Sequence, residues 1–153
     1  MSIKKEIPNI LTLGNLLAGC LGLYFVMQSK LEFAAYMIFI SLICDFLDGF
    51  LARLLHAYSD IGKELDSLAD VVSFGILPSF ILLNLVEQSC GNQCTIGLFG
   101  FYKPFLVFSL ALMSAYRLAK FNVDTRQTDQ FIGVPTPANG LLVASLPLIL
   151  HFQ

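Results

Sequence analysis

Four aspartates lie in two otherwise apolar segments of this chain, separated by a short polar stretch. Asp45 and Asp48 are spaced i, i+3, and Asp66 and Asp70 are spaced i, i+4, so on helices each pair shares one face. A carboxylate in a bilayer costs about 2.5–3.5 kcal/mol on insertion scales, so four of them require a compensating cation or a water-filled cavity. The pattern therefore indicates a metal-dependent active site in a membrane protein.

The aspartates predict hard divalent cations and phosphoryl chemistry. Four carboxylates from two helix ends can hold one or two ions through oxygen, the ligand type that Mg²⁺, Mn²⁺ and Ca²⁺ prefer. His56 is the only imidazole nearby, and no cysteine is well placed, so zinc and iron fit poorly. Two such cations clamp phosphate oxygens and stabilise both the attacking and the leaving oxygen in a displacement at phosphorus. We therefore expect a divalent metal pair, Mg²⁺ or Mn²⁺ with Ca²⁺ as a further candidate.

Small and cationic residues beside the aspartates suit an anionic ligand. Gly49, Ala52 and Gly62 lack bulk, which lets a flat base or a diphosphate approach the helix backbone. Arg53 can make a bidentate phosphate contact. Ser59 and Asp60 suit the N-terminal cap of a helix that begins near Gly62, where exposed amides also favour an anion.

The rest of the chain predicts membrane helices. Its 153 residues are 56% hydrophobic and only 13% charged, with a mean hydropathy of +0.75. Soluble domains carry about 25% charged residues. The formal net charge of −2 is uninformative, because the distribution of the charges along the chain matters and their sum does not. We expect the bilayer as a partner, and no nucleic acid.

Five membrane spans are expected, because about 20 apolar residues at about 1.5 Å each cross the hydrocarbon core. Residues 7–29 contain no charged side chain and form the first span. The others are expected at about 32–55, 62–86, 97–122, and from 135–137 to near the last residue. The sequence thus predicts an all-α polytopic transmembrane helix bundle, as a single domain over residues 1–153.

A cleaved signal peptide is the competing interpretation of the N-terminus. Its apolar run exceeds the usual signal-peptide core of about 7–15 residues, so we expect the first span to be retained.

Cys90 and Cys94 fall in a predicted outer loop, where a disulfide and two unpaired thiols are both open. Ala18 and Gly22 form a small-x3-small pair that permits close helix approach.

The positive-inside rule predicts the orientation. With the N-terminus inside, two cations fall outside, Lys30 and Lys103, and seven fall inside: Lys4, Lys5, Arg53, Lys63, Arg117, Lys120 and Arg126. The aspartates are then expected on the cytoplasmic side of the inner (cytoplasmic) membrane.

The residues described above fit the pattern D-x2-D-G-x2-A-R-x8-G-x3-D-x3-D at every position. This pattern resembles the CDP-alcohol phosphotransferase family, membrane enzymes that transfer a phosphatidyl-type group from a CDP-linked lipid to an alcohol and release CMP. The resemblance implies that the metal ligands are Asp45, Asp48, Asp66 and Asp70. It also implies that Asp70, with Asp66 beside it, is catalytic and takes the proton of the acceptor hydroxyl.

The same resemblance implies a site for the CDP-lipid. The positions it carries over are Gly49, Ala52, Arg53 and Gly62, with Arg53 on the diphosphate. We expect Asp48, Ser59, Asn9 and Thr12 to belong to the same site. Asn9 and Thr12 are equally explained as the polar start of a helix.

Three further stretches resemble the phosphatidylserine synthases of this family. They are PNILTLGNL at 8–16, DSLADVVSFGILP at 66–78, and RLAKFN at 117–122 followed by GVPTPAN at 133–139. The expected acceptor is therefore L-serine, and the expected donor is CDP-diacylglycerol or CDP-archaeol. Arg117, Lys120, Asn122 and Ser73 are the expected serine contacts, although flanking charges explain Arg117 and Lys120 equally well.

Family members usually have six spans and form homodimers, so the resemblance implies a homodimer and a chain that lacks its C-terminal span. Two alternatives stay open. Another acceptor, such as glycerol phosphate or inositol phosphate, would preserve the chemistry, but a denser Arg and Lys cluster would be expected. A cation transporter would also use intramembrane carboxylates, but it leaves the glycine, alanine and arginine positions unexplained.

Overall fold

A computed structural model describes residues 3–57, 59–90, 98–123 and 135–151, and this part of the chain is helical. The elements are α1 (Ile3–Met27), α2 (Leu31–Leu54), α3 (Asp60–Asp70), the π-helical segment η1 (Val71–Ile76), α4 (Leu77–Cys90), α5 (Leu98–Val123) and α6 (Thr136–His151). The predicted helical bundle is confirmed. Cys94 and Arg126 lie outside the described residues, as do the side chains of Lys4, Lys5, Cys90 and Lys103, so a disulfide and two unpaired thiols both stay open for Cys90 and Cys94.

Four helical stretches within the described residues are long and apolar enough to cross a membrane: Glu6–Met27, Leu31–Leu54, Asp60–Ser89 and Pro104–Val123. A fifth apolar stretch, Thr136–Leu150, is shorter. The third is a continuous rod of 30 residues built from α3, η1 and α4. Such a rod is about 45 Å long, so it is longer than the hydrocarbon core of a membrane, which is about 30 Å thick.

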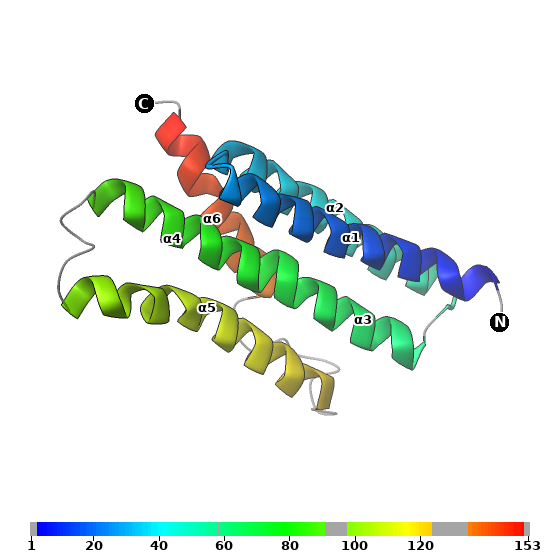
Figure 1. Cartoon of the computed structure of the whole chain (residues 1–153). Coiled ribbons are helices and arrows are strands. Elements are labelled where there is room, and N and C mark those ends of the chain that lie inside the picture. The colour runs from blue at the N-terminus through cyan, green and yellow to red at the C-terminus, as the bar shows by residue number, and fades with distance from the viewer. Residues whose placement is uncertain (1–2, 58, 91–97, 124–134, 152–153) are drawn as a thin grey trace.

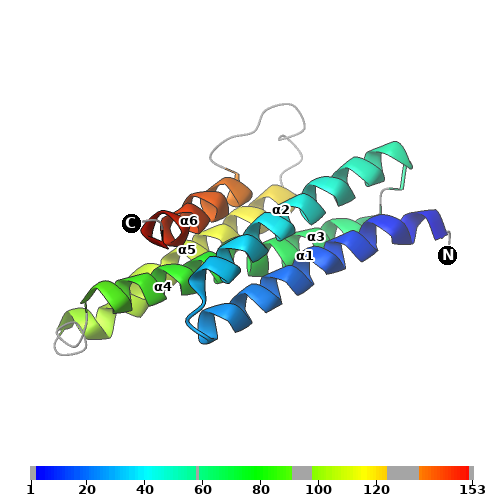
Figure 2. The ribbon, with the colours of Figure 1, turned by 90° about the horizontal axis from the view of Figure 1, so that it is seen from above.

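The helices alternate in direction, so several helix ends gather at one end of the bundle (Figure 1). α1 and α2 form an antiparallel hairpin, the α3–η1–α4 rod runs beside it, and α5 returns along that rod (Figures 1 and 2). α6 packs against α2, α4 and η1. The start of α1, the end of α2, the start of α3 and the end of α5 therefore lie at the same end of the molecule (Figure 1).

The apolar core lies away from that end, where α1, α2, α6 and the η1–α4 rod meet. Ile38, Phe74, Leu77 and Ile81 are fully buried there. Small residues allow the close packing: a Cβ built on Gly22 would collide with the Leu77 side chain. The small-x3-small pair of α1 is thus used for packing within the chain.

Left-handed residues end two of the helices. Ser29 has φ 56°, and the amide of Lys30 donates to the Phe25 carbonyl at 2.9 Å. His56 has φ 50°, and the amide of Ala57 donates to the Ala52 carbonyl at 3.0 Å. Both are 6→1 bonds of the Schellman type, which end a helix within one residue and turn the chain.

A cap begins the next helix. Ser59 has extended backbone angles, and its hydroxyl accepts a hydrogen bond from the Gly62 amide at 3.0 Å, as the sequence predicted. α2 consequently ends at Leu54 and α3 begins at Asp60, which brings the two aspartate pairs to the same end of the bundle.

The π-helical segment follows Asp70 directly, and no sequence signal predicted it. It contains Ser73, Phe74 and Gly75, all buried. A π-turn inserts one residue, which rotates the following helix face by about 100°. α3 and α4 thereby present different faces to the same neighbours.

Candidate active site

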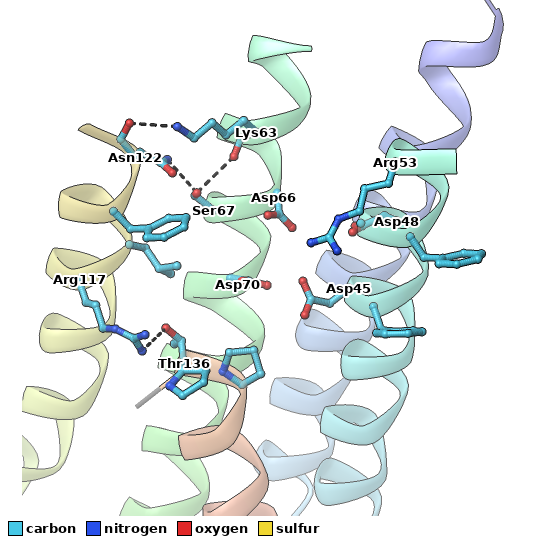
Figure 3. A pocket seen from close by; sticks show the side chains of 17 residues that line it. Asp45, Asp48, Arg53, Lys63, Asp66, Ser67, Asp70, Arg117, Asn122 and Thr136 are labelled. Atoms are coloured by element: carbon cyan, nitrogen blue, oxygen red, sulfur yellow. Dashed lines mark hydrogen bonds between the residues drawn. The ribbon is translucent and has the colours of Figure 1, made fainter. Parts of the chain in front are cut away.

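The four aspartates face one another across the space between α2 and α3 (Figure 3). Carboxylate oxygens of Asp45, Asp48 and Asp66 lie within 4.8 Å of one another. Asp48 and Asp70 are buried, with 5% and 7% of their surface exposed, and the other two are half-buried. The helix spacing thus places each pair on one face of its helix, and the arrangement of α2 and α3 brings the two pairs together.

Two cavities meet at this cluster. The first cavity, of about 570 Å³, lies among α2, α3, α5 and the start of α6, and is lined by Asp45, Phe46, Asp48, Gly49, Phe50, Arg53, Lys63, Asp66, Ser67, Asp70, Arg117, Leu118, Phe121, Asn122, Pro135, Thr136 and Pro137. The second cavity, of about 810 Å³, lies among the start of α1, the end of α2 and the start of α3. Six residues line both: Asp48, Gly49, Arg53, Lys63, Asp66 and Phe121.

The residues expected to contact the CDP-lipid line the second cavity. All eight do so: Asn9, Thr12, Asp48, Gly49, Ala52, Arg53, Ser59 and Gly62. Gly62 is tightly enclosed, because a Cβ there would lie 2.9 Å from the Ser59 hydroxyl and 3.0 Å from Asn9 Oδ1. Residues as far apart in sequence as Asn9 and Gly62 are therefore in one wall.

The residues expected to contact the acceptor separate into two groups. Arg117 and Asn122 line the first cavity. Lys120 is exposed and lies outside the lining of both cavities. Ser73 is fully buried and also outside both linings, and its hydroxyl donates to the Asn15 carbonyl at 3.0 Å.

Three hydrogen bonds tie α5 to its neighbours at the first cavity (Figure 3). The Arg117 guanidinium donates to the hydroxyl of Thr136, the first residue of α6, at 3.3 Å. The Asn122 side-chain amide donates to the Ser67 hydroxyl at 2.8 Å, and Lys63 Nζ donates to the Asn122 carbonyl at 3.0 Å. These contacts join segments that are far apart in sequence, which is why Thr136 was not predicted as a site residue.

α1 supplies a hydrogen-bond donor to one aspartate of each pair. The Thr12 hydroxyl donates to Asp48 Oδ2 at 2.7 Å, and the Asn15 amide donates to Asp70 Oδ1 at 3.1 Å. Thr12 was expected at the nucleotide, and Asn15 was missed. Its signal was available, since it is a polar residue three positions after Thr12 in an apolar span and so shares a helix face with it.

The donor set fits a hard divalent cation. Asp66 Oδ1 is buried and has no hydrogen-bond partner among the described residues. A buried carboxylate oxygen left unpaired is costly, and so are several carboxylates close together. A cation beside the three gathered carboxylates would relieve both costs, and an all-oxygen site is typical of Mg²⁺, Mn²⁺ or Ca²⁺.

Comparison with known proteins points to the same enzyme family as the aspartate motif does. A family model described as CDP-alcohol phosphatidyltransferase matches residues 5–152. The chain is 34% identical to a CDP-diacylglycerol–serine O-phosphatidyltransferase of Bacillus subtilis, over 92% of this chain and 74% of the relative. It is 37% identical to the enzyme of that name from Helicobacter pylori (93% of this chain, 57% of the relative) and 36% identical to that from Methanocaldococcus jannaschii (93% and 61%). The chain thus spans less than two thirds of the latter two relatives. No solved structure matches it.

Proposed function

The chain belongs to the CDP-alcohol phosphatidyltransferase family, and on that premise we propose that it transfers a phosphatidyl group from a CDP-linked lipid to L-serine. The serine hydroxyl oxygen forms a bond to the phosphorus that carries the lipid, the phosphorus–oxygen bond to CMP breaks, and the hydroxyl proton passes to a base. The products are phosphatidylserine and CMP. The observation that best supports this proposal is the aspartate cluster, which lies where the two cavities meet.

The two cavities suit the two substrates. The second cavity holds the eight residues expected at the CDP-lipid, and the guanidinium of Arg53 is placed for the diphosphate. Gly49 belongs to both cavities, and a Cβ there would enter open space. A ligand can therefore approach the helix backbone at this point.

The first cavity suits an amino-acid acceptor. Arg117 offers a guanidinium for the serine carboxylate, and its hydrogen bond to Thr136 helps to orient it. The Asp70 carboxylate lies in the same cavity and accepts the hydroxyl proton as general base. The relatives named as serine phosphatidyltransferases support this choice of acceptor.

We assign the divalent metal pair to Asp45, Asp48, Asp66 and Asp70. Such ions supply charge neutralisation of the phosphate oxygens and stabilise the leaving oxygen. Asp45, Asp48 and Asp66 carry the close oxygens, and Asp70 joins them from the next turn of α3.

The long apolar helices and the family make this an integral membrane protein. We infer that the aspartate end faces the cytoplasm at the inner membrane, because most lysines and arginines then lie inside. The family resemblance favours a homodimer. Its interface must lie elsewhere than at Gly22, which packs within the chain.

The test is CMP release by the purified protein in detergent, with a CDP-lipid and Mg²⁺ or Mn²⁺. Serine, glycerol 3-phosphate, inositol 1-phosphate and no acceptor are compared. Release that requires serine and stops with a chelator supports the proposal. Release with another alcohol keeps the mechanism and overturns the acceptor, whereas cation flux without CMP release overturns the enzyme assignment.

A further inference from the structure

Two neutral donors on α1 reach carboxylates on two different helices. The Thr12 hydroxyl bonds Asp48 on α2 at 2.7 Å, and the Asn15 amide bonds Asp70 on α3 at 3.1 Å. Both donors are buried, with 3% and 0% of their surface exposed. We propose that this donor pair, Thr12 and Asn15, consists of positioning residues that fix one oxygen of each carboxylate and leave the other for a cation.

The chemistry of the donors suits this role. A hydroxyl and an amide orient a carboxylate without cancelling its charge, whereas a lysine or arginine in their place would compete with a cation. The Thr12 hydroxyl has one proton and two acceptors within reach, Asp48 Oδ2 at 2.7 Å and the Pro8 carbonyl at 3.1 Å. The shorter distance and the charge of the carboxylate favour the bond to Asp48. The amide of Asn15 is likewise set, because its reversed orientation would bring two acceptor oxygens together at Asp70.

The backbone that carries the donor pair is itself held from two sides. The Asn15 carbonyl accepts a hydrogen bond from the Ser41 hydroxyl of α2 at 3.2 Å and from the Ser73 hydroxyl of η1 at 3.0 Å. At Gly19, one turn further, a Cβ would lie 2.5 Å from the Ser73 hydroxyl. α1 is therefore held against both α2 and the α3–η1–α4 rod. Through the donor pair, it fixes the position of Asp48 relative to that of Asp70.

Packing alone does not explain Asn15. Its Oδ1 atom is buried without a hydrogen-bond partner among the described residues, which disfavours an amide at this position. A leucine of similar volume would avoid that cost. The contact to Asp70 supplies the reason for an amide here.

The inference rests on the proposed metal chemistry, so binding of Mn²⁺ alone is the direct test. Free Mn²⁺ is titrated with the full chain in detergent and followed by electron paramagnetic resonance, with serine-dependent CMP release measured in parallel. The variants are Thr12→Val, which preserves shape, Thr12→Ser, which preserves the hydroxyl, and Asn15→Leu. The matched control is Ser79→Ala. The buried Ser79 hydroxyl donates to the Gly75 carbonyl four residues earlier, as the Thr12 hydroxyl can to Pro8, and it makes no hydrogen bond to an aspartate within the described part of the chain.

Second-sphere partners of metal ligands change metal affinity by about 10–100-fold, so Thr12→Val and Asn15→Leu are each expected to weaken Mn²⁺ binding by about 10-fold or more. Thr12→Ser and Ser79→Ala are expected to bind Mn²⁺ as the wild type does. Wild-type affinity in both Thr12→Val and Asn15→Leu overturns the inference. If Asn15→Leu does not fold, the Mn²⁺ affinity of Thr12→Val alone decides between these outcomes. Failure of the wild type itself to bind Mn²⁺ overturns the proposed metal chemistry instead.

Discussion

Arg117 and Lys120 lie one turn apart on α5, yet they face different surroundings. Arg117 lines the first cavity and bonds Thr136, whereas Lys120 is exposed outside both cavities. Gly49 is also distinguished by its surroundings. A Cβ built on it meets no heavy atom within 4 Å among the described residues outside its own helix. At the scale of single residues, position on a helix does not identify a site residue; the cavity that the residue lines does.

Arg117→Ala is expected to raise the KM for serine by about 10–100-fold, because a hydrogen bond to a charged group contributes about 1.5–3 kcal/mol. The KM for the CDP-lipid should change much less. Steady-state CMP release with each substrate varied in turn measures both. Lys120→Ala is the matched control, and an equal rise of both constants in Arg117→Ala would place that residue outside the acceptor site.

Asp66→Asn is expected to abolish turnover and leave the fold intact. The change keeps the volume but removes one ligand charge from a buried cluster. CMP release and the thermal unfolding midpoint in detergent measure the two effects. Glu64→Gln, an exposed change on the same helix, is the control and should retain activity. Turnover near wild type in Asp66→Asn would contradict the metal assignment.

Gly49→Ala is expected to stabilise the fold and impair catalysis. Replacing a helical glycine by alanine stabilises by about 0.5–1 kcal/mol where there is room, and here there is. The added methyl enters the space shared by both cavities, so the KM for the CDP-lipid should rise. A higher unfolding midpoint with unchanged kinetics would show that the ligand does not approach this backbone.

At the scale of elements, short turns and one irregular segment align the aspartates. The Schellman-type end of α2 and the Ser59 cap of α3 reverse the chain between Leu54 and Asp60. The π-helical segment η1 follows the last aspartate, as π-bulges often do at functional sites. It lets α3 turn its carboxylates toward α2 while Phe74 and Leu77 enter the core.

Ser29→Gly is expected to raise the unfolding midpoint without changing activity. A left-handed residue with a side chain costs about 1–2 kcal/mol, and Ser29 has φ 56° at the end of α1 remote from the aspartates. Thermal unfolding in detergent tests this. Ser109→Gly, in the middle of α5, is the matched control and should destabilise by about 0.5–1 kcal/mol. A lower unfolding midpoint for Ser29→Gly would show that the left-handed backbone of Ser29 does not destabilise the fold.

At the scale of the molecule, the alternating helices bring the start of α1, the end of α2, the start of α3 and the end of α5 to one end of the bundle (Figure 1). These segments, together with the start of α6, supply most of the residues that line the two cavities. The α2–α3 turn lies at that end, and the α1–α2 turn lies at the opposite end (Figure 1). The proposed substrates, which carry a diphosphate or a carboxylate, would thus reach the aspartates from one end of the bundle.

His56→Cys, in a chain whose native cysteines are replaced, should react with a membrane-impermeant thiol reagent in inside-out vesicles and stay protected in intact cells. Gln28→Cys, at the other end, should show the reverse. Both positions are exposed. The opposite labelling pattern would invert the proposed orientation.

The sequence alone determined the helices and the aspartate motif. Hydrophobic length, helical periodicity and the Ser59 cap are local properties, so the spans, the turn and the shared face of each aspartate pair could be predicted. The motif spacing also located five of the expected CDP-lipid residues, which line the second cavity: Asp48, Gly49, Ala52, Arg53 and Gly62.

The contacts between the helices could not be predicted from the sequence and became visible in the tertiary structure. The contacts Thr12–Asp48, Asn15–Asp70 and Arg117–Thr136 join residues from different helices. The division into two cavities and the exclusion of Lys120 and Ser73 depend in the same way on helix rotation and packing. Periodicity sets the face of one helix, but packing against the others decides what that face meets.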